Sequence, residues 1–253
     1  MSVKFEGKVA LVTGGGSGIG RATALAFARE GADVCVIDIN EARGKESVHL
    51  IENNYHKASF IKADVSATAD VEEMANQVIN TYGRLDFAFN NAGVQGPASL
   101  VADYTEQDWG RVIDVNLKGI WLCMKYEIPQ MLKNGSGAIV NSSSVTGIVG
   151  SHSSPAYSAS KHGIIGLTKT SALQYSKVGI RINAVCPSAI RTPMLEDILR
   201  SNPEKKARFI ASVPIGRFGK PEEVAEAVIW LCSSEASFIT GIAMPIDGGW
   251  TAQ

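Results

Sequence analysis

The chain has 253 residues, of which 45% are hydrophobic, 19% charged and 7% aromatic, and this composition excludes a disordered or fibrous protein. The 24 Lys and Arg residues against 25 Asp and Glu residues give a formal net charge of -1, without the positive excess of nucleic-acid or polybasic membrane binders. No apolar run approaches the ~18 residues of a membrane span. The cysteines form no C-x-x-C pair, so we expect reduced thiols and a cytoplasmic protein. From the charge and the apolar runs, we expect it to bind neither nucleic acid nor membranes.

Apolar runs of strand length alternate with helix-period segments along nearly the whole chain. The first run, KVALVT at 8–13, has no in/out alternation, which is typical of a strand buried on both faces of a parallel sheet. Further strands are expected at 33–38, 59–64, 85–90, 137–143, 179–186 and about 243–247. Helices are expected at about 19–30, 41–53, 68–82, 105–133, 155–177 and 221–233. This order predicts one α/β domain over 1–253, a doubly wound, Rossmann-like parallel sheet of about seven strands with helices on both faces.

The alternation of strands and helices lapses at about 187–217. This stretch is polar and contains Pro187, Pro193, Pro203 and Pro214. In doubly wound sheets, ligands bind at the carboxyl ends of the strands, so an insertion at this position can cover them. We interpret it as a substrate lid.

A glycine-rich loop follows the first strand and opens into a helix. Its glycines leave the backbone N–H groups and the helix N-terminus accessible to a pyrophosphate, which a side chain would hold away. Such a loop alone could be only a tight turn, but its place between a strand and a helix favours a dinucleotide site. The expected cofactor contacts in the loop are Gly14, Ser17, Gly18, Ile19 and Gly20.

Asp38 ends the second strand, 18 residues after Gly20. A carboxylate there can accept hydrogen bonds from the adenosine ribose hydroxyls and would repel a 2′-phosphate. Ile39 and Asn40 follow, and neither is a cation. We therefore expect NAD to be preferred over NADP. As an alternative, Asp38 could cap the next helix, and both roles could hold.

Tyr157 and Lys161 are four residues apart on an expected helix, so their side chains share one face. A free tyrosine has a pKa of ~10, and a nearby ammonium or a positively charged nicotinamide favours its phenolate. The spacing alone is weak, but Ser144 lies 13 residues before Tyr157, just past the fifth strand. A hydroxyl there can bond to a carbonyl oxygen and orient it toward the phenol.

Together, the loop Thr13-Gly14-x-x-x-Gly18-Ile19-Gly20, the run Asn90-Asn91-Ala92-Gly93, Asn116, Ser144 and Tyr157-x-x-x-Lys161 resemble the short-chain dehydrogenase/reductase family over essentially the whole chain. The resemblance implies that Tyr157 is the general acid/base and that Ser144 holds the substrate oxygen. It also implies that Lys161 binds the nicotinamide ribose and lowers the tyrosine pKa. Asn116 would keep a water in a proton relay from Lys161.

The resemblance implies further contacts. Those to the cofactor are Ile39, Asp64, Val65, Asn91, Ala92, Gly93, Tyr157, Lys161, Pro187, Ile190 and Thr192. Asn91 has an equally plausible structural role. Those to the substrate are Val94, Ser144, His152, Tyr157 and Ser188. Ser188 departs from the family's usual Pro-Gly, and its side chain could narrow or polarise the entry beside the nicotinamide.

The sequence thus predicts an NAD-dependent alcohol dehydrogenase or carbonyl reductase for a compact, neutral secondary alcohol or ketone, and the resemblance implies a homotetramer. Two alternatives stay open: an epimerase or dehydratase that retains its nucleotide, and a non-catalytic NAD-binding regulatory protein. No His/Asp/Glu cluster has metal-ligand spacing, so no metal is expected.

Overall fold

The computed structural model describes residues 4–55, 57–199 and 203–253. Within these ranges, seven strands form one parallel sheet in the order β3-β2-β1-β4-β5-β6-β7. The strands are β1 (Val9–Thr13), β2 (Asp33–Asp38), β3 (Ala58–Lys62), β4 (Phe87–Asn90), β5 (Gly137–Ser142), β6 (Ile180–Pro187) and β7 (Ala243–Ile246). The winding direction reverses between β1 and β4, so the predicted doubly wound sheet is confirmed.

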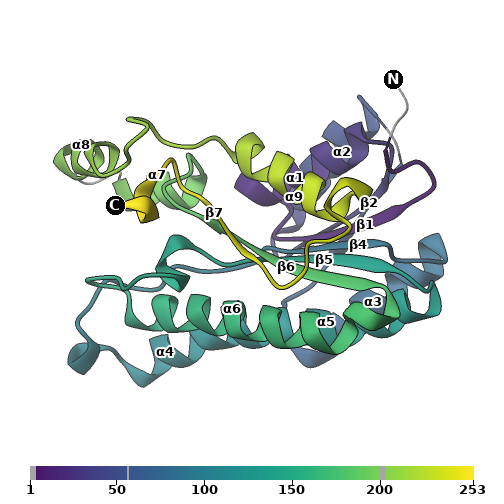
Figure 1. The fold of residues 1–253 in the computed structure, drawn as a ribbon, viewed down its shortest axis with the longest axis horizontal. Coiled ribbons are helices and arrows are strands. Elements are labelled where there is room, and N and C mark those ends of the chain that lie inside the picture. Colours follow the sequence, from purple (N-terminus) through teal and green to yellow (C-terminus); the bar gives the residue numbers. More distant parts are fainter. Residues whose placement is uncertain (1–3, 56, 200–202) are drawn as a thin grey trace.

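Helices cover both faces of the sheet (Figure 1). On one face lie α1 (Gly18–Arg29), α2 (Glu41–Glu52) and α9 (Pro221–Cys232). On the other lie α3 (Thr68–Tyr82), α4 (Glu106–Ile113), α5 (Gly119–Lys133) and α6 (Pro155–Tyr175). The 3₁₀ turns are Val101–Asp103, Val145–Gly147, Ser176–Val178, Ser234–Ala236 and Trp250–Ala252. Among the described residues, no helix is long and apolar enough to cross a membrane.

The strands form where continuous apolar runs can be buried from both sides. Every residue of β1 is buried, and in β2 the four residues from Val34 to Ile37 are buried as well. Alternate side chains enter two separate clusters: Val12 packs under α1 and α9, whereas Leu11 packs under α3 and α5. Burial on both faces therefore accounts for the missing in/out alternation.

The prediction of a single helix over 105–133 is wrong in one respect. A π-helical turn, Asp114–Lys118, separates α4 from α5. At its centre, the Asn116 side chain binds both polar groups of the Val94 backbone, at 2.8 and 2.9 Å. A π turn inserts one extra residue into the helix, and hydrophobic periodicity carries no signal for a contact made by a loop 22 residues away.

The stretch 187–217 contains two short helices that the sequence analysis did not predict. They are α7 (Pro193–Leu199) and α8 (Pro203–Ala211). Each begins at a proline, because the first helical position needs no N–H and proline has the required φ. Residues 200–202 lie outside the described residues, and a lid function of this stretch stays a prediction.

Candidate active site

The predicted site residues follow the carboxyl ends of six neighbouring strands. β1 leads into the glycine loop, β2 ends at Asp38, and β3 is followed by Asp64. β4, β5 and β6 lead into the segments of Asn91, Ser144 and Ser188. Because all the strands are parallel, residues as far apart in the chain as Gly14 and Ser188 meet at one edge of the sheet.

The glycine loop is closely packed against its neighbours. Gly14 and Gly18 have φ of +62° and +51°, a region that side chains rarely adopt. A Cβ on Gly16 would lie 2.6 Å from Asp38 Oδ2, and one on Gly18 would lie 3.1 Å from Thr192 Cγ2. The structure thus brings the loop, Asp38 and Thr192 together, as the predicted cofactor site requires.

The N-terminus of α1 has donors to offer an anion. Its N-cap, Ser17, makes no side-chain capping hydrogen bond, and its first turn carries no acidic residue. N–H groups of the first turn have no partner within the helix, and the helix dipole there favours negative charge. The residues present therefore fit a dinucleotide diphosphate, with Ser17, Gly18 and Ile19 as the expected donors.

Asp38 does not cap the next helix, so that alternative is wrong. The N-cap of α2 is Asn40, whose side chain accepts a hydrogen bond from Arg43 N at 3.0 Å. Asp38 instead accepts from Gly16 N at 2.9 Å and from Asn40 N at 2.8 Å. A carboxylate has about four acceptor sites, so Asp38 keeps acceptor capacity for ribose hydroxyls.

Asn91 ties the cofactor loop to the sheet. Its side-chain amide donates to the carbonyl oxygen of Thr13 at 3.1 Å. The Thr13 hydroxyl in turn accepts from the backbone N–H groups of Asn91 and Ala92, at 2.9 and 3.1 Å. Asn91 thus has the structural role that was left open, and its contact with the cofactor stays a prediction.

Tyr157 and Lys161 lie on one face of α6, as expected. Lys161 is buried, and its Nζ lies 5.3 Å from the centroid of the Tyr157 ring. The ammonium donates to the backbone carbonyl oxygen of Ser142 at 2.7 Å. Ser144 hydrogen-bonds the phenol. The structure therefore brings Ser144, Tyr157 and Lys161 together.

The environment moves the pKa values of both ionisable groups. Burial raises the pKa of Tyr157 to about 12, against the hydrogen bond from Ser144, which lowers it. Burial also lowers the pKa of Lys161 to about 8. The pKa of Tyr157 thus lies above its ordinary value, and the lowering of that pKa by Lys161 that the resemblance implies stays a prediction.

Thr146 orients Ser144, and the sequence analysis missed this contact. The Ser144 Oγ accepts from the Thr146 backbone N at 3.2 Å and from its hydroxyl at 3.1 Å. The Ser144 hydroxyl donates in turn to the carbonyl oxygen of Pro187 at 3.5 Å, which is at the long limit of a hydrogen bond. A second missed contact joins the Ser143 hydroxyl to the carbonyl oxygen of Lys161, at 2.8 Å. Hydroxyls next to a suspected catalytic serine are the only signal that the sequence offers.

Asn116 is completely buried, and its side chain is used within the protein. Besides binding the Val94 backbone, it donates to the Ser160 hydroxyl at 3.2 Å. It therefore fixes the substrate-side loop that begins at Val94 next to α6. The water of a proton relay stays a prediction.

The remaining predicted residues are spread around this edge. Ile39 is 63% exposed, His152 is exposed in a loop, and Val65 lies against Gly119. Asp64 Oδ1 accepts from the backbone N and hydroxyl of Ser66, which makes a local turn.

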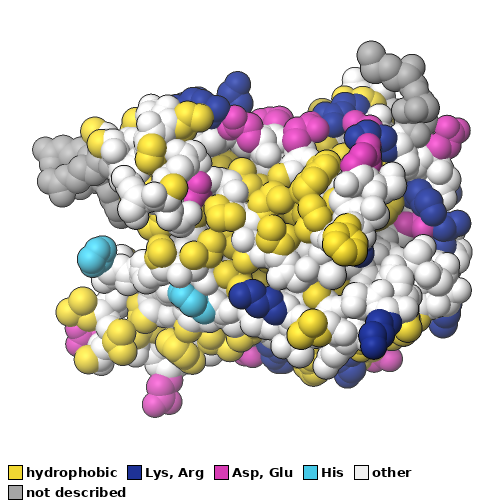
Figure 2. Space-filling view, viewed as in Figure 1, with side chains coloured by type: hydrophobic (Ala, Val, Ile, Leu, Met, Phe, Trp, Pro, Cys, Tyr) yellow, Lys and Arg dark blue, Asp and Glu magenta, His cyan; other side chains and the backbone are white. Residues whose placement is uncertain are grey.

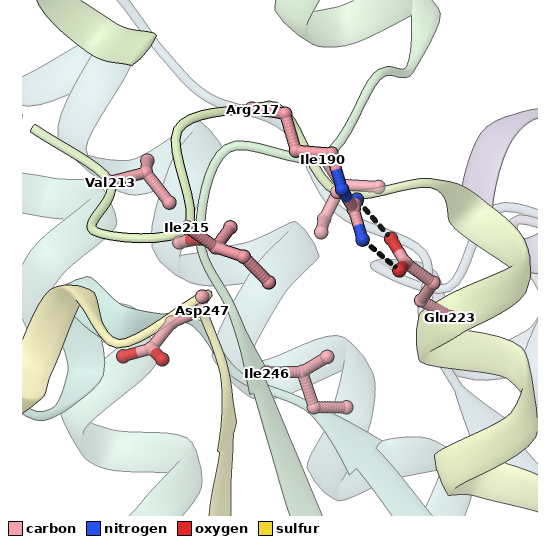
Figure 3. A pocket seen from close by; sticks show the side chains of 10 residues that line it. Ile190, Val213, Ile215, Arg217, Glu223, Ile246 and Asp247 are labelled. Atoms are coloured by element: carbon pink, nitrogen blue, oxygen red, sulfur yellow. Dashed lines mark hydrogen bonds and ion pairs between the residues drawn. The ribbon is translucent and has the colours of Figure 1, made fainter. Parts of the chain in front are cut away.

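Ser188 and Ile190 line a cavity of about 120 Å³ (Figure 3). Its other walls include Val213, Ile215 and Ile246. Charged side chains line it as well: Asp247, and the Arg217 guanidinium, which pairs with the Glu223 carboxylate at 2.6 Å. Pro187, the last residue of β6, precedes this group. The Ser188 side chain thus stands beside a small space with both apolar and charged walls.

One cysteine, Cys186 on β6, borders the site, where it interacts with Ser143 and Lys161, and burial raises the pKa of its thiol to about 11. All four cysteines are free and buried, and burial raises the pKa of Cys35 and of Cys232 to about 12. In the part of the chain that the structure describes, no group of three or more His, Cys, Asp or Glu side chains could hold a metal ion.

Comparison with known proteins places this geometry among oxidoreductases. Residues 14–251 match the family model described as "Enoyl-(Acyl carrier protein) reductase". Cyclohexanol dehydrogenase from Acinetobacter sp. (strain SE19) is 43% identical over 253 residues, with 100% of this chain and 98% of the relative covered. The 3-oxoacyl-[acyl-carrier-protein] reductase of Thermotoga maritima is 44% identical over 248 residues, covering 98% and 99%. The structure of NAD⁺-bound xylitol dehydrogenase has a TM-score of 0.94 and 35% identity, covering 97% of this chain and 100% of the other.

Proposed function

The chain belongs to the short-chain dehydrogenase/reductase family and is an oxidoreductase of that family, and we propose that it interconverts a small secondary alcohol and its ketone with NAD(H). The observation that carries the proposal is the cluster of Ser144, Tyr157 and Lys161, which lies at the same edge of the sheet as the glycine loop. When bound, the nicotinamide supplies or accepts the hydride. The protein has to supply or accept the proton of the substrate hydroxyl.

In ketone reduction, Tyr157 would donate its phenolic proton to the substrate oxygen. Its raised pKa keeps the proton available near neutral pH. The Ser144 hydroxyl, oriented by Thr146, would donate a hydrogen bond to the same oxygen. The Lys161 ammonium would then stabilise the phenolate that is left. Alcohol oxidation runs through the same positions in reverse.

The preference for NAD rests on Asp38. Its carboxylate lies against Gly16 of the cofactor loop, where a negative charge disfavours a 2′-phosphate and accepts bonds from hydroxyls. A compact cyclic or short secondary alcohol is the proposed substrate, and the name of the relative cyclohexanol dehydrogenase supports that class.

We also propose a homotetramer. Hydrophobic side chains gather over β7 between α9 and α6 (Figure 2), and β7 is the open edge of the sheet. Exposed apolar residues of this region include Phe238 and Ile242, and a second face carries Trp109 and Trp121 on α4 and α5. A molecular mass equal to that of a monomer, measured by solution scattering, would contradict the proposal. The cytoplasm stays the predicted compartment.

Replacing Tyr157 by Phe tests the proposed reaction. The variant keeps the ring but cannot transfer a proton, so kcat for a panel of secondary alcohols and ketones should fall by about 10²–10⁴-fold. Absorbance of the reduced nicotinamide, measured with NAD and NADP, reports turnover and cofactor preference together.

Tyr175→Phe, at the far end of the same helix, is the matched control and should keep its kcat. Accumulation of reduced cofactor with turnover separates a dehydrogenase from an epimerase or dehydratase that retains its nucleotide. Equal activities of Tyr157→Phe and wild type would overturn the proposed mechanism, and no turnover with any panel member would favour a regulatory protein.

A further inference from the structure

Glu127 is a fully buried carboxyl group outside the proposed catalytic cluster. It lies on the face of α5 that packs against the sheet, among Cys123, Met124 and Met131, and its exposed fraction is 0%. Asp86, another buried carboxylate, is bound by Lys8 and Arg84. Among the described residues, no such cation pairs with Glu127, whose polar contact is Asn90. A buried ionised carboxylate without a cation is strongly disfavoured.

The hydrogen bonds around Glu127 leave two oxygen atoms without partners. Asn90 Nδ2 donates to Glu127 Oε2 at 3.0 Å and to Asn141 Oδ1 at 3.2 Å, which uses both of its N–H groups. Asn141 Nδ2 donates in turn to the Thr168 hydroxyl at 3.0 Å. In the described residues, the buried Asn90 Oδ1 and Glu127 Oε1 make no hydrogen bond. Both are acceptors if the carboxyl group is ionised, so neither can satisfy the other.

We infer that Glu127 is a neutral carboxylic acid in the folded protein and forms a cyclic acid–amide pair with Asn90. In this pair, Asn90 Nδ2–H donates to Glu127 Oε2, and Glu127 Oε1–H donates to Asn90 Oδ1. One proton thereby gives both orphaned oxygens a partner, because protonation converts a carboxyl oxygen from acceptor to donor. A carboxylic acid and a primary amide are both planar and each offers a donor beside an acceptor.

The surroundings favour the neutral form. Burial raises the pKa of Glu127 to about 7, against the hydrogen bond from Asn90, which lowers it. Cys123, one turn earlier on α5, is the titratable group that interacts with it, and burial raises the pKa of that thiol as well. Charged groups on the neighbouring elements have partners of their own. They are Asp86 before β4, Glu72 on α3 (bound by Tyr126), Lys161 on α6 (bound to Ser142) and Arg181 on β6 (bound to Leu231 and Ser233).

The pair lies directly beneath the proposed active site, and its role there rests on the proposed function. Asn90 ends β4 and is followed by Asn91, which holds the cofactor loop. Asn141 is followed by Ser142, whose carbonyl oxygen accepts from Lys161. Glu127 is therefore a positioning residue that acts through Asn90 and Asn141 on two strand ends.

The variant Glu127→Gln tests the inference, because a glutamine amide reproduces the hydrogen bonds of the neutral acid. The folded protein keeps a proton that the unfolded chain, with its ordinary pKa of 4.5, releases. The free energy of unfolding of the wild type should therefore decrease as the pH rises from 4.5 to about 7. Over this range its unfolding constant should rise by up to about tenfold per pH unit relative to Glu127→Gln. Urea unfolding at fixed protein concentration measures this difference.

Glu52→Gln, an exposed substitution at the end of α2, is the matched control and should follow the wild-type pH profile. The infrared spectrum of the wild type near pH 6 should contain the C=O band of a protonated carboxyl group, a measurement that needs no variant to fold. Parallel stability profiles of wild type and Glu127→Gln, or the absence of that band, would overturn the inference. Neither measurement depends on activity, so failure here is distinct from failure of Tyr157→Phe.

Discussion

The two faces of the sheet bury different kinds of side chains. Under α1, α2 and α9 the core is apolar, with the rings of Phe5, Phe27 and Phe87 at 4.6–5.8 Å from one another. The buried polar side chains on that side bind backbone groups: the hydroxyls of Thr23 and Ser47 and the amide of Asn183 all donate to backbone carbonyl oxygens. Under α5 and α6 the apolar cluster contains amide and ionisable groups. They are Asn90, Asn116, Glu127, Asn141 and Lys161.

This difference assigns separate tasks to the faces. On the first face, β1, α1 and β2 present backbone donors and one carboxylate, so their contribution to the proposed reaction is cofactor affinity. On the second face, α5 and α6 hold groups that carry protons, and hydrogen bonds rather than packing fix their positions. Changes on the second face should therefore alter kcat and its pH dependence, whereas changes on the first should alter cofactor affinity or stability alone.

Lys161→Met should have the largest effect. It removes the ammonium beside Tyr157 while keeping the length of the side chain, and kcat should fall by about 10²–10⁴-fold. In the wild type, ketone reduction should slow as the pH rises through about 8, because the ammonium is lost there. This limb should be absent from the pH profile of the variant. Lys169→Met, exposed on the same helix, should leave the kinetics unchanged, and an equal loss in both variants would break the comparison.

Asp38→Asn should have an intermediate effect on the other face. Losing the charge weakens hydrogen bonds to the ribose, so KM for NAD should rise about tenfold or more while kcat changes little. The ratio of kcat/KM for NADP to that for NAD should rise. Asp33→Asn, at the opposite end of β2, controls for the lost charge. A fall in kcat with an unchanged KM for NAD would show that this face does not act through cofactor affinity.

Phe27→Leu should have the smallest effect. It removes part of a fully buried ring on α1, and the free energy of unfolding should fall by about 1–1.5 kcal/mol. Urea unfolding measures the loss. Unchanged kcat and KM would support the distinction between a face that contributes packing alone and a face with ionisable groups. A marked fall in kcat would contradict that distinction.

The sequence predicted the sheet and the proximity of Tyr157 and Lys161, because both depend on short-range patterns. Burial on both faces leaves unbroken apolar runs such as β1, and the four-residue spacing of Tyr157 and Lys161 places them on one helix face. The alternative that Asp38 caps a helix failed because Asn40 was nearer to the first turn of α2. The helices α7 and α8 were missed because prolines were taken as interruptions, although a proline can also begin a helix.

The buried acid offered one signal that was not used: Glu127 occupies a position on the apolar stripe of α5, three residues after Met124 and four before Met131. A charged residue in such a stripe needs a partner, but no local pattern says that the partner is Asn90 on β4.

The sequence by itself determined the order of the elements, the glycine loop and the spacing of the proton-carrying groups, since each is written in a few consecutive residues. Only the tertiary structure decided the π turn at Asn116, the contact of Thr146 with the Ser144 hydroxyl, and the pairing of Asn90 with Glu127. The physical reason is that pKa values and hydrogen-bond roles depend on burial and on neighbours brought together by the fold, which segments distant in the chain supply.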